Sequence, residues 1–555
     1  MNASPARRPW RGLLLLGLAA LVLDLWGIQH GPLRDWDESL VARVALELSD
    51  KPWPDGLLPS LWGQPYHNKP PGAHWLIAGL IQLWRSGGAP AGALPPEWLI
   101  RLAPALGSSL LSPLLALVQW QLRPGRRADA LWTGAIALTL LPLARHAHLA
   151  MLDGLQLTAM AALWLGLLLA RPSGRQPLAA GVLAGLAGTL LLLLKAPVLL
   201  PVLLVSLLLR RTDGDLQGRH WRWLLLGLGL GLLPGLAWHG WHLLCRGDAA
   251  LVMWGRQGLA RVANSLENHG GGPLPPLIQV LSGGWPWLAL WPAGISQAWR
   301  QRRERWGRWS LGLTALATLM VLPLQTQLPW YSLLLWPPFA LCCGPVLAAL
   351  VEGRLPAKWR RGIAGLWLGL GVLVLIGAVL SPLLPSLAAL RPMAGLALPG
   401  GLGLLIAGWR LGSERGSLSG RGAAAWALVL GWGLSLLLLF STPLWNWELN
   451  ERPSILPLLP LVSRDSRAGQ LAEVPLLVDG SIGKRPSLRW YAQDSLGRKR
   501  SRALSGTVLL VSRAKTPEQS ELARRLGREQ VNGSNCQLDR QGGQGWSRWL
   551  CQLGD

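Results

Sequence analysis

Three carboxylates stand close together early in the chain, in the stretch GPLRDWDESLVARVALEL that begins at residue 31. They are Asp35, Asp37 and Glu38, and they follow the first long apolar run of a chain whose formal net charge is +25. A carboxylate in such a place can serve as a general base, or it can be an ordinary solvated loop residue. We expect Asp35 to be a solvated loop residue, so other polar residues must indicate whether a site exists here.

Further polar residues lie beside later apolar runs. Lysine is scarce, with seven residues in the whole chain, so Lys69 in YHNKPPGAHW and Lys195 in LLLLLKAPVLLP are unusual by position. Four more polar residues also lie at the ends of apolar runs: Asp153, Arg261, Gln325 and Gln327. Each has a simpler interpretation, Lys195 as a snorkelling anchor and Asp153 as a helix cap. Together, carboxylates and cations on one side of a membrane favour an enzyme that handles a lipid phosphate, since cations hold an oxyanion while a carboxylate accepts a proton.

The elements that position these residues are membrane helices. Half of the 555 residues are hydrophobic, 15% are charged and the mean hydropathy is positive, and apolar runs of about 15 to 20 residues recur along the chain. This composition is typical of a polytopic α-helical membrane protein. Nucleic-acid binding is excluded, because arginine falls in short clusters between apolar runs and no basic stripe alternates with stacking aromatic residues.

The loop charges predict the topology. The N-terminus is arginine-rich and is expected inside, which places residues 30–98 outside as a long first loop. The segment GAHWLIAGLIQLW (72–84) is too short to cross a bilayer and is expected to be interfacial or re-entrant. All six later arginine-rich loops then fall inside: 123–127, 171–175, 210–222, 300–308, 354–361 and 410–421. About 13 spans result, near 11–29, 99–122, 130–145, 154–170, 178–194, 196–209, 223–244, 278–299, 309–325, 330–350, 362–381, 394–410 and 424–442.

The chain changes character near residue 446. Residues 1–445 are expected to form the transmembrane domain, and residues 446–555 a small soluble α/β domain outside the cytoplasm. VPLLVDG (474–480) and TVLLVS (507–512) predict strands, whereas 486–492 and 516–530 have helical patterns. If this tail is outside, Cys536 and Cys551 can form a disulfide. No motif in the tail indicates chemistry.

Five segments carry a resemblance to a known family. WDESLVARVALEL, QPYHNKPPGAHWL, HAHLAMLDG, LLLKAPVLLP and LPWYSLLLWPPFA, in this order and spacing, resemble the polytopic glycosyltransferases of GT-C type that include bacterial aminoarabinose transferases and protein O-mannosyltransferases. The resemblance covers most of the chain and is strongest over residues 31–200. It implies a bacterial inner-membrane enzyme that takes a sugar from a polyprenyl-phosphate donor and transfers it, with inversion, to a lipid, protein or glycan acceptor outside the cytoplasm.

The resemblance also implies roles for individual residues. Asp37 matches the family's general base, which would accept the proton of the acceptor hydroxyl. Glu38, Asp153, Gln327 and Tyr331 are expected at the acceptor, with a structural pairing of Glu38 or Asp153 with Arg43 as the alternative. The phosphate of the donor is expected to be held by Lys69, Lys195 and Arg261.

Cofactors are not required by this chemistry. Relatives have an acidic residue directly before the Lys-Pro pair, and this chain has Asn68, a poor ligand for a transition metal. A divalent metal with His67 as a ligand is therefore the disfavoured alternative, and His146 and His148 are expected to be hydrogen-bonded structural residues. Two other classes stay open. A transporter would also place ionisable residues in a helical bundle, and a non-catalytic scaffold of the same fold would not need Asp37.

Overall fold

The computed structural model describes residues 10–90, 92–255, 273–413, 417–447, 458–462, 476–478, 485–492, 506–520, 531 and 535–553. The chain divides into two compact units. Unit 1 comprises residues 1–30, 66–76 and 101–445, and unit 2 comprises residues 31–65, 77–100 and 446–555. The domain limits expected from the sequence, 1–445 and 446–555, stay a prediction.

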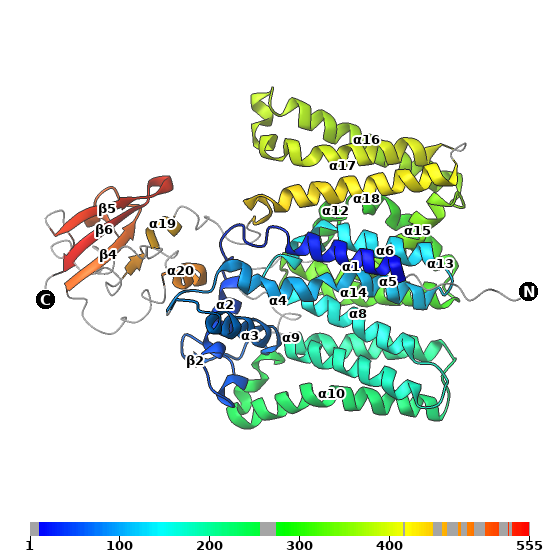
Figure 1. Cartoon of the computed structure of the whole chain (residues 1–555), viewed down its shortest axis with the longest axis horizontal. Coiled ribbons are helices and arrows are strands. Elements are labelled where there is room, and N and C mark those ends of the chain that lie inside the picture. The colour runs from blue at the N-terminus through cyan, green and yellow to red at the C-terminus, as the bar shows by residue number, and fades with distance from the viewer. Residues whose placement is uncertain are drawn as a thin grey trace, which may run out of the picture. The chain divides into compact units, whose positions relative to one another are not determined.

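Helices form most of the described chain (Figure 1). The α-helices are α1 (Trp10–Leu25), α2 (Glu38–Ser49), α3 (Gly72–Ser86), α4 (Glu97–Ser109), α5 (Leu111–Leu122), α6 (Arg127–Thr139), α7 (Leu141–Ala147), α8 (Asp153–Leu169), α9 (Gln176–Thr212), α10 (Arg219–Arg246), α12 (Leu274–Gly283), α13 (Trp291–Arg300), α14 (Arg305–Val321), α15 (Trp336–Val351), α16 (Ala357–Leu380), α17 (Arg391–Gly412), α18 (Leu418–Phe440), α19 (Leu459–Val462) and α20 (Pro486–Tyr491). The strands are β1 (Ser60–Leu61), β2 (Gln64–Pro65), β3 (Leu476–Val478), β4 (Gly506–Ser512), β5 (Cys536–Gln541) and β6 (Ser547–Leu553).

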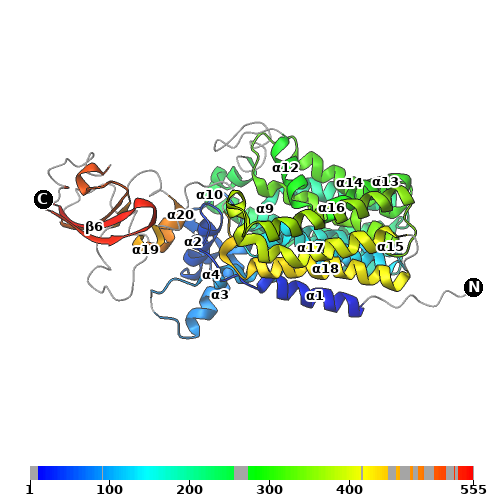
Figure 2. The same cartoon turned by 90° about the horizontal axis from the view of Figure 1, so that it is seen from above.

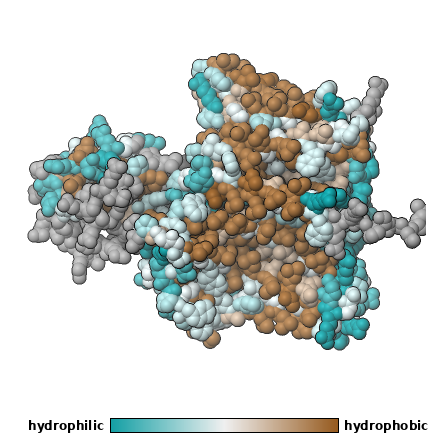
Figure 3. All heavy atoms as spheres, in the orientation of Figure 1, coloured by the Kyte–Doolittle hydropathy of each residue, from teal (hydrophilic) through white to brown (hydrophobic). Residues whose placement is uncertain are grey.

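Unit 1 is a bundle of long helices. Figure 2 shows α16, α17 and α18 running alongside one another. Seven helical segments of the described residues are long and apolar enough to cross a membrane: 97–122, 176–212, 219–253, 329–351, 357–380, 385–412 and 418–440. Their outward faces carry leucines such as Leu373 and Leu430, and Figure 3 shows the sides of these helices as largely apolar. The expected class, a multi-pass helical membrane protein, is confirmed. Every expected span is helical, but the count of 13 crossings stays a prediction.

The arginine-rich loops gather at one end of unit 1. Arg126 pairs with Glu352 at 3.0 Å, and Arg305 pairs with Asp213 at 3.2 Å. Arg210 donates to the carbonyl oxygens of Leu167 and Ala170, and Gly353 lies against the side chain of Arg421. The guanidinium of Arg123 lies 5.0 Å from the ring centre of Trp306, which joins these contacts into one group. The six loops that the sequence predicts on one side of the membrane therefore share one end of the bundle, called here the arginine-rich end. Its other end is called the opposite end.

α9 contains a sharp break that makes it two helices. At Lys195 the backbone leaves the helical region, with φ −154° and ψ 77°. Gln176, at the start of α9, donates to the carbonyl oxygen of Leu169 at 2.9 Å, and Arg210, near its end, donates to that of Leu167 at 3.0 Å. Both ends of α9 thus lie at the arginine-rich end, so its halves run antiparallel with Lys195 at the tip. The expected division into spans 178–194 and 196–209 agrees with this hairpin.

The first half of α9 packs closely on α10. A Cβ atom on Gly185 would come within 2.7 Å of the Cα of Gly231, and one on Gly235 would lie 3.1 Å from the Cα of Thr189. Glycine is needed at these positions because the two backbones nearly touch, a common device of membrane helix pairs.

α3 does not cross the bundle. Arg101, near the start of the α4–α5 segment, donates to the carbonyl oxygen of Ile28 at 2.9 Å. The chain is therefore at the same end of unit 1 before and after residues 29–100, and a single crossing by α3 would have left it at the other end. The interfacial or re-entrant interpretation of residues 72–84 fits this arrangement.

Unit 2 contains a four-stranded sheet of the order β3-β4-β6-β5. β3 and β4 are parallel, and the other neighbours are antiparallel. The expected strands near 474–480 and 507–512 are β3 and β4, and the expected helix 486–492 is α20. Of the expected helix 516–530, residues 517–519 form a 3-10 turn and residues 521–530 lie outside the described residues.

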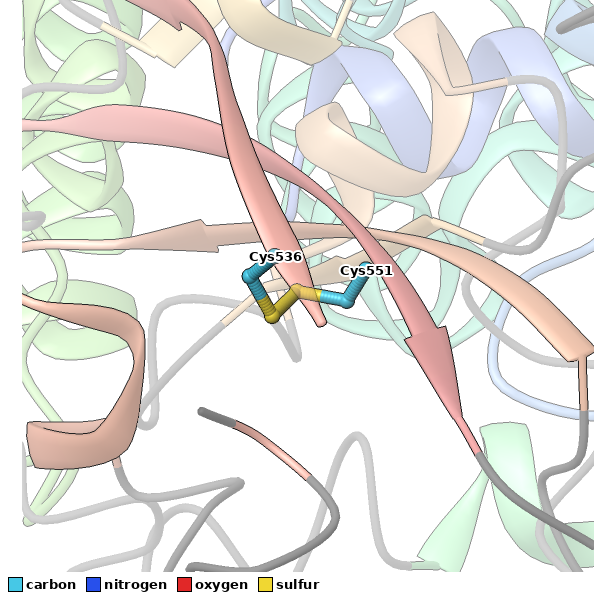
Figure 4. The surroundings of a disulfide bond; sticks show 2 residues. All are labelled: Cys536 and Cys551. Carbon is cyan, nitrogen blue, oxygen red and sulfur yellow. A yellow bond between two sulfur atoms is a disulfide. The ribbon is translucent and has the colours of Figure 1, made fainter. Parts of the chain in front are cut away.

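The expected disulfide is present in unit 2. Cys536 of β5 and Cys551 of β6 face each other across the two strands and are bonded (Figure 4). Cys245, Cys342 and Cys343 are free.

Candidate functional site

Lys195, Asp153 and Tyr331 form one cluster in unit 1. The Nζ atom of Lys195 lies 3.5 Å from Oδ1 of Asp153 and 5.0 Å from the centre of the Tyr331 ring. Asp153 and Tyr331 are buried, whereas the side chain of Lys195 is 35% exposed. The ammonium group is thus held on one side by a carboxylate and an aromatic face, with another side still accessible to a ligand.

The local sequence explains why Lys195 stands at the tip of the α9 hairpin. Pro197 follows in the motif KAP, and proline lacks the N–H that a continuing helix would need. The ring of Pro197 also clashes with the carbonyl of the preceding turn, so the helix is interrupted within that turn, at Lys195, and Pro197 lies in the first turn of the second half of α9. The break turns a lysine in the middle of a long apolar run into a residue at the opposite end of the bundle.

Residues 66–72 carry Lys69 to the same end of unit 1. Arg246, at the end of α10, donates to the carbonyl oxygen of Tyr66 at 3.0 Å, and Gly72 packs against the backbone of Leu193, two residues before Lys195. Burial, with the charge of Lys69 as the second cause, lowers the pKa of His74 to about 3. Lys69, Lys195 and Arg246 therefore form a set of cations at the opposite end. Arg246 was not expected from the sequence, although its place at the end of an apolar run was the available signal.

Two of the expected residues are not among the contacts of this cluster that the structure describes. Gln327 is buried and donates from Nε2 to the carbonyl oxygens of Val321 and Leu324, at 3.0 and 2.8 Å, which indicates that it closes a turn. Arg261 lies outside the described residues.

The acidic stretch lies in unit 2, and Asp37 stands at the start of α2. Its side chain is partly buried and does not cap that helix. Glu38 is fully buried, and its Oε2 accepts a hydrogen bond from the backbone N–H of Arg34 at 3.0 Å. Arg43 pairs with Glu47 at 2.7 Å, and Asp153 pairs with Lys195. The alternative pairing of Glu38 or Asp153 with Arg43 stays a prediction.

Asp35 is not a solvated loop residue, and that expectation was wrong. Its side chain is 3% exposed, accepts hydrogen bonds from the N–H and the hydroxyl of Ser487, and lies 3.2 Å from Nη1 of Arg485. Burial raises the pKa of Asp35, and the contacts with Ser487 and Arg485 offset only part of that rise. The partners are about 450 positions away in the sequence, which is why no local pattern indicated them.

The histidines fit structural roles. His146 and His148 contact, through Nδ1, the carbonyl oxygens of Pro142 and Ala144, and His148 also stacks on Phe440. His67 lies 5.9 Å from the ring of His242. Among the residues that the structure describes, no group of three or more metal-ligating side chains occurs.

Asp24 is a buried carboxyl that the sequence analysis did not single out. It lies in α1, is 5% exposed and lines a cavity of about 20 Å³ with Ser108 and His146, room for about one water molecule. Within the described part of the chain, no cation pairs with it. The signal for it was the lone charge in the run LLLLGLAALVLDLW, because an ionisable residue inside a membrane span often has a function.

Comparisons with known proteins identify the fold. The chain is similar to the crystal structure of ArnT from Cupriavidus metallidurans bound to undecaprenyl phosphate, with a TM-score of 0.68 and 18% identity, covering 98% of both chains. It is similar to the same protein in the apo state, with a TM-score of 0.66, 18% identity and the same coverage. No family model matches the sequence, and no curated protein matches it. The GT-C type fold that the sequence resemblance implied is thereby confirmed.

Proposed function

We propose that this chain is a membrane glycosyltransferase that takes a sugar from a polyprenyl-phosphate donor. The observation that carries the proposal is the cluster of Asp153, Lys195 and Tyr331 at the break of α9, with Lys69 and Arg246 at the same end of unit 1. Cations placed around one point stabilise a phosphate oxyanion. The similar structure of ArnT contains undecaprenyl phosphate, a donor carrier of the class proposed here.

The proposed reaction is an inverting displacement. An acceptor oxygen attacks the anomeric carbon of the sugar, the bond from that carbon to the phosphate oxygen breaks, and polyprenyl phosphate leaves with the electron pair. Lys69, Lys195 and Arg246 stabilise the charge on the leaving phosphate, with Arg261 as a further candidate. Asp37 takes the proton of the acceptor hydroxyl as the general base.

The acceptor is a lipid, protein or glycan outside the cytoplasm. We assign Asp153 and Tyr331 to the substrate region because they contact Lys195, whereas the contacts of Glu38 and Gln327 favour structural roles for these two residues. The arginine-rich end is assigned to the cytoplasm of a bacterial inner membrane by the positive-inside rule, and the opposite end to the extracytoplasmic side.

The proposal is tested with the purified full chain in lipid nanodiscs. Undecaprenyl-phosphate sugars are supplied with an envelope extract, and the release of undecaprenyl phosphate is measured by mass spectrometry. Release that depends on the extract and is lost in Lys195→Met supports the proposal. Absence of release with every donor, together with solute movement across vesicles, would replace it with the transporter alternative. Absence of both, with unchanged function of Asp37→Asn in cells, would favour a scaffold.

A further inference from the structure

α20 of the tail binds the segment that leads into Asp37. Ser487 donates to Oδ1 of Asp35 from its N–H, at 3.2 Å, and from its hydroxyl. Arg485 pairs with the other carboxylate oxygen. One turn further on, the Tyr491 hydroxyl accepts the N–H of Leu33 at 2.7 Å. Two polar groups of one short helix thus contact the chain at residues 33 and 35.

The sequence PSLRWYA explains how one short helix can pack on the apolar core of the domain and also contact the first loop. Leu488 and Ala492 are four residues apart and belong to the apolar core that includes Leu476 of β3 and Leu509 of β4. Ser487 and Tyr491 are also four residues apart, so they share a neighbouring face of the helix, and this face contacts the first loop. The small domain holds α20 by one face and presents the other to residues 33–35.

Further contacts strengthen this attachment. The Tyr491 hydroxyl donates to Oε1 of Glu97 at 2.9 Å, and the guanidinium of Arg489 lies 3.5 Å from the ring centre of Trp62, a cation–π contact. Residues 33, 62 and 97 belong to three separate parts of residues 30–98, the long first loop expected from the sequence. We call Arg485, Ser487, Arg489 and Tyr491 the 485–491 clamp.

The turn between the clamp and Asp37 is closed by its own hydrogen bonds. The N–H of Arg34 donates to Glu38, and the Ser39 hydroxyl donates to the carbonyl oxygen of Arg34 at 2.7 Å. Asp37 lies inside this turn, between the residues that the clamp holds and the first turn of α2. A shift at Asp35 must therefore move the backbone of Asp37.

The ion pair between Asp35 and Arg485 is better explained by position than by stability. Because burial raises the pKa of Asp35 even with Arg485 and Ser487 beside it, the pair does not repay the cost of removing the carboxylate from water. Buried polar groups of this kind can fix one arrangement among several. Here they fix the path of the loop that carries the proposed base.

We propose that the 485–491 clamp positions Asp37, so that the C-terminal domain is part of the transfer machinery. This inference rests on the function proposed above. Arg485, Ser487 and Tyr491 act through the loop as positioning residues and do not touch the substrate in this proposal.

Hydrogen exchange of the full chain in nanodiscs tests the clamp without any activity. In Arg485→Gln/Ser487→Ala, the amides of residues 33–39 should exchange about tenfold faster or more, because their anchoring hydrogen bonds are lost. Exchange in β4 and β6 should not change. Arg513→Gln, which removes an exposed arginine of the same domain, is the matched control. If exchange in β4 and β6 also becomes faster in the double variant, exchange at residues 33–39 is measured in Tyr491→Phe, because this variant removes only a single hydroxyl.

Kinetics give the second readout. The double variant should lower kcat by tenfold or more while KM for the donor stays within twofold, and Ser487→Thr should keep kcat near that of the wild type. Unchanged exchange at residues 33–39 in both variants would overturn the clamp whatever the activity. Faster exchange with full kcat would limit the clamp to a structural role and overturn positioning. A wild-type protein without transfer activity would count against the proposed function alone.

Discussion

The Nζ atom of Lys195 lies 3.5 Å from Oδ1 of Asp153, although the lysine belongs to a helix break and the aspartate to the first turn of another helix. The pair joins α8 and α9 at the opposite end of unit 1. The Asp153 carboxylate contacts the ammonium group from one side, and the Tyr331 ring covers it from another direction. These contacts hold the ammonium group in one place, where a lipid phosphate would lie in the proposed function.

Lys195→Met should weaken capture of the donor. The phosphate loses one charged partner while Asp37 remains, so KM for the polyprenyl-phosphate donor should rise about tenfold or more. Lys358→Met, at an exposed lysine at the start of α16, is the control and should leave KM unchanged. Steady-state kinetics in nanodiscs measure both, and an unchanged KM in Lys195→Met would remove Lys195 from the donor site.

Asp37→Asn should abolish transfer and leave folding intact. The amide keeps the shape of the side chain but cannot accept the proton, and a general base commonly contributes about 10² to 10⁴ in rate. Asp55→Asn, at an exposed aspartate that also lies within residues 30–98, is expected to keep full activity. Ordinary rates in the Asp37 variant would show that another group is the base.

The effect of Arg485→Gln on stability should depend on pH through Asp35. The pKa of Asp35 in the folded chain is raised above its ordinary value of 3.8, so the stability linked to this group is fully present below pH 3.8 and is lost as the pH rises through the folded pKa. Arg485 favours the ionised form. Its removal should therefore lower Tm little at low pH and more above the folded pKa of Asp35.

Thermal unfolding followed by tryptophan fluorescence measures this difference across the pH range. Arg513→Gln provides the baseline for losing a positive charge elsewhere in the domain. A Tm difference between Arg485→Gln and the wild type that is the same at every pH would show that Arg485 does not act on the Asp35 carboxylate.

Cys536 and Cys551 should be absent from a thiol count. The chain has five cysteines and two are bonded, so the unfolded, unreduced protein should react at three thiols and the reduced protein at five. Closing a loop of this size stabilises a domain by about 3 kcal/mol in the chain-entropy view. Mass spectrometry after alkylation gives the count, and five reactive thiols before reduction would contradict the disulfide.

Reporter fusions should place Arg85 and Arg127 on opposite sides of the membrane. The chain returns to the opposite end of unit 1 at Arg101, so α3 makes no crossing and α4 with α5 makes one. Since the arginine-rich loops are expected inside, a fusion after Arg85 should score as extracytoplasmic and one after Arg127 as cytoplasmic. The same side for both fusions would contradict the path of the chain, and exchanged sides would contradict only the orientation.

The sequence by itself determined which segments are helices and where several of them end. Apolar runs of membrane length have to be helical, because no other structure satisfies their backbone groups in lipid. The expected spans 178–194 and 196–209 placed a division at Lys195, where Pro197 interrupts the helix within one turn, and TVLLVS predicted β4 for a similarly local reason. Cys536 and Cys551 could be paired in advance since they are the two cysteines of the tail.

Only the tertiary structure decided which polar groups meet. Asp35 has the sequence surroundings of a solvated loop residue, yet it is buried and contacts Arg485 and Ser487, and Asp153 pairs with Lys195 of another helix. Asp24 reaches Ser108 and His146 across a cavity through the packing of α1 on other helices. Local patterns fix the periodicity of an element and its apolar face. The partner of a buried charge is chosen by the packing of segments hundreds of residues apart, where burial without a partner costs several kcal/mol.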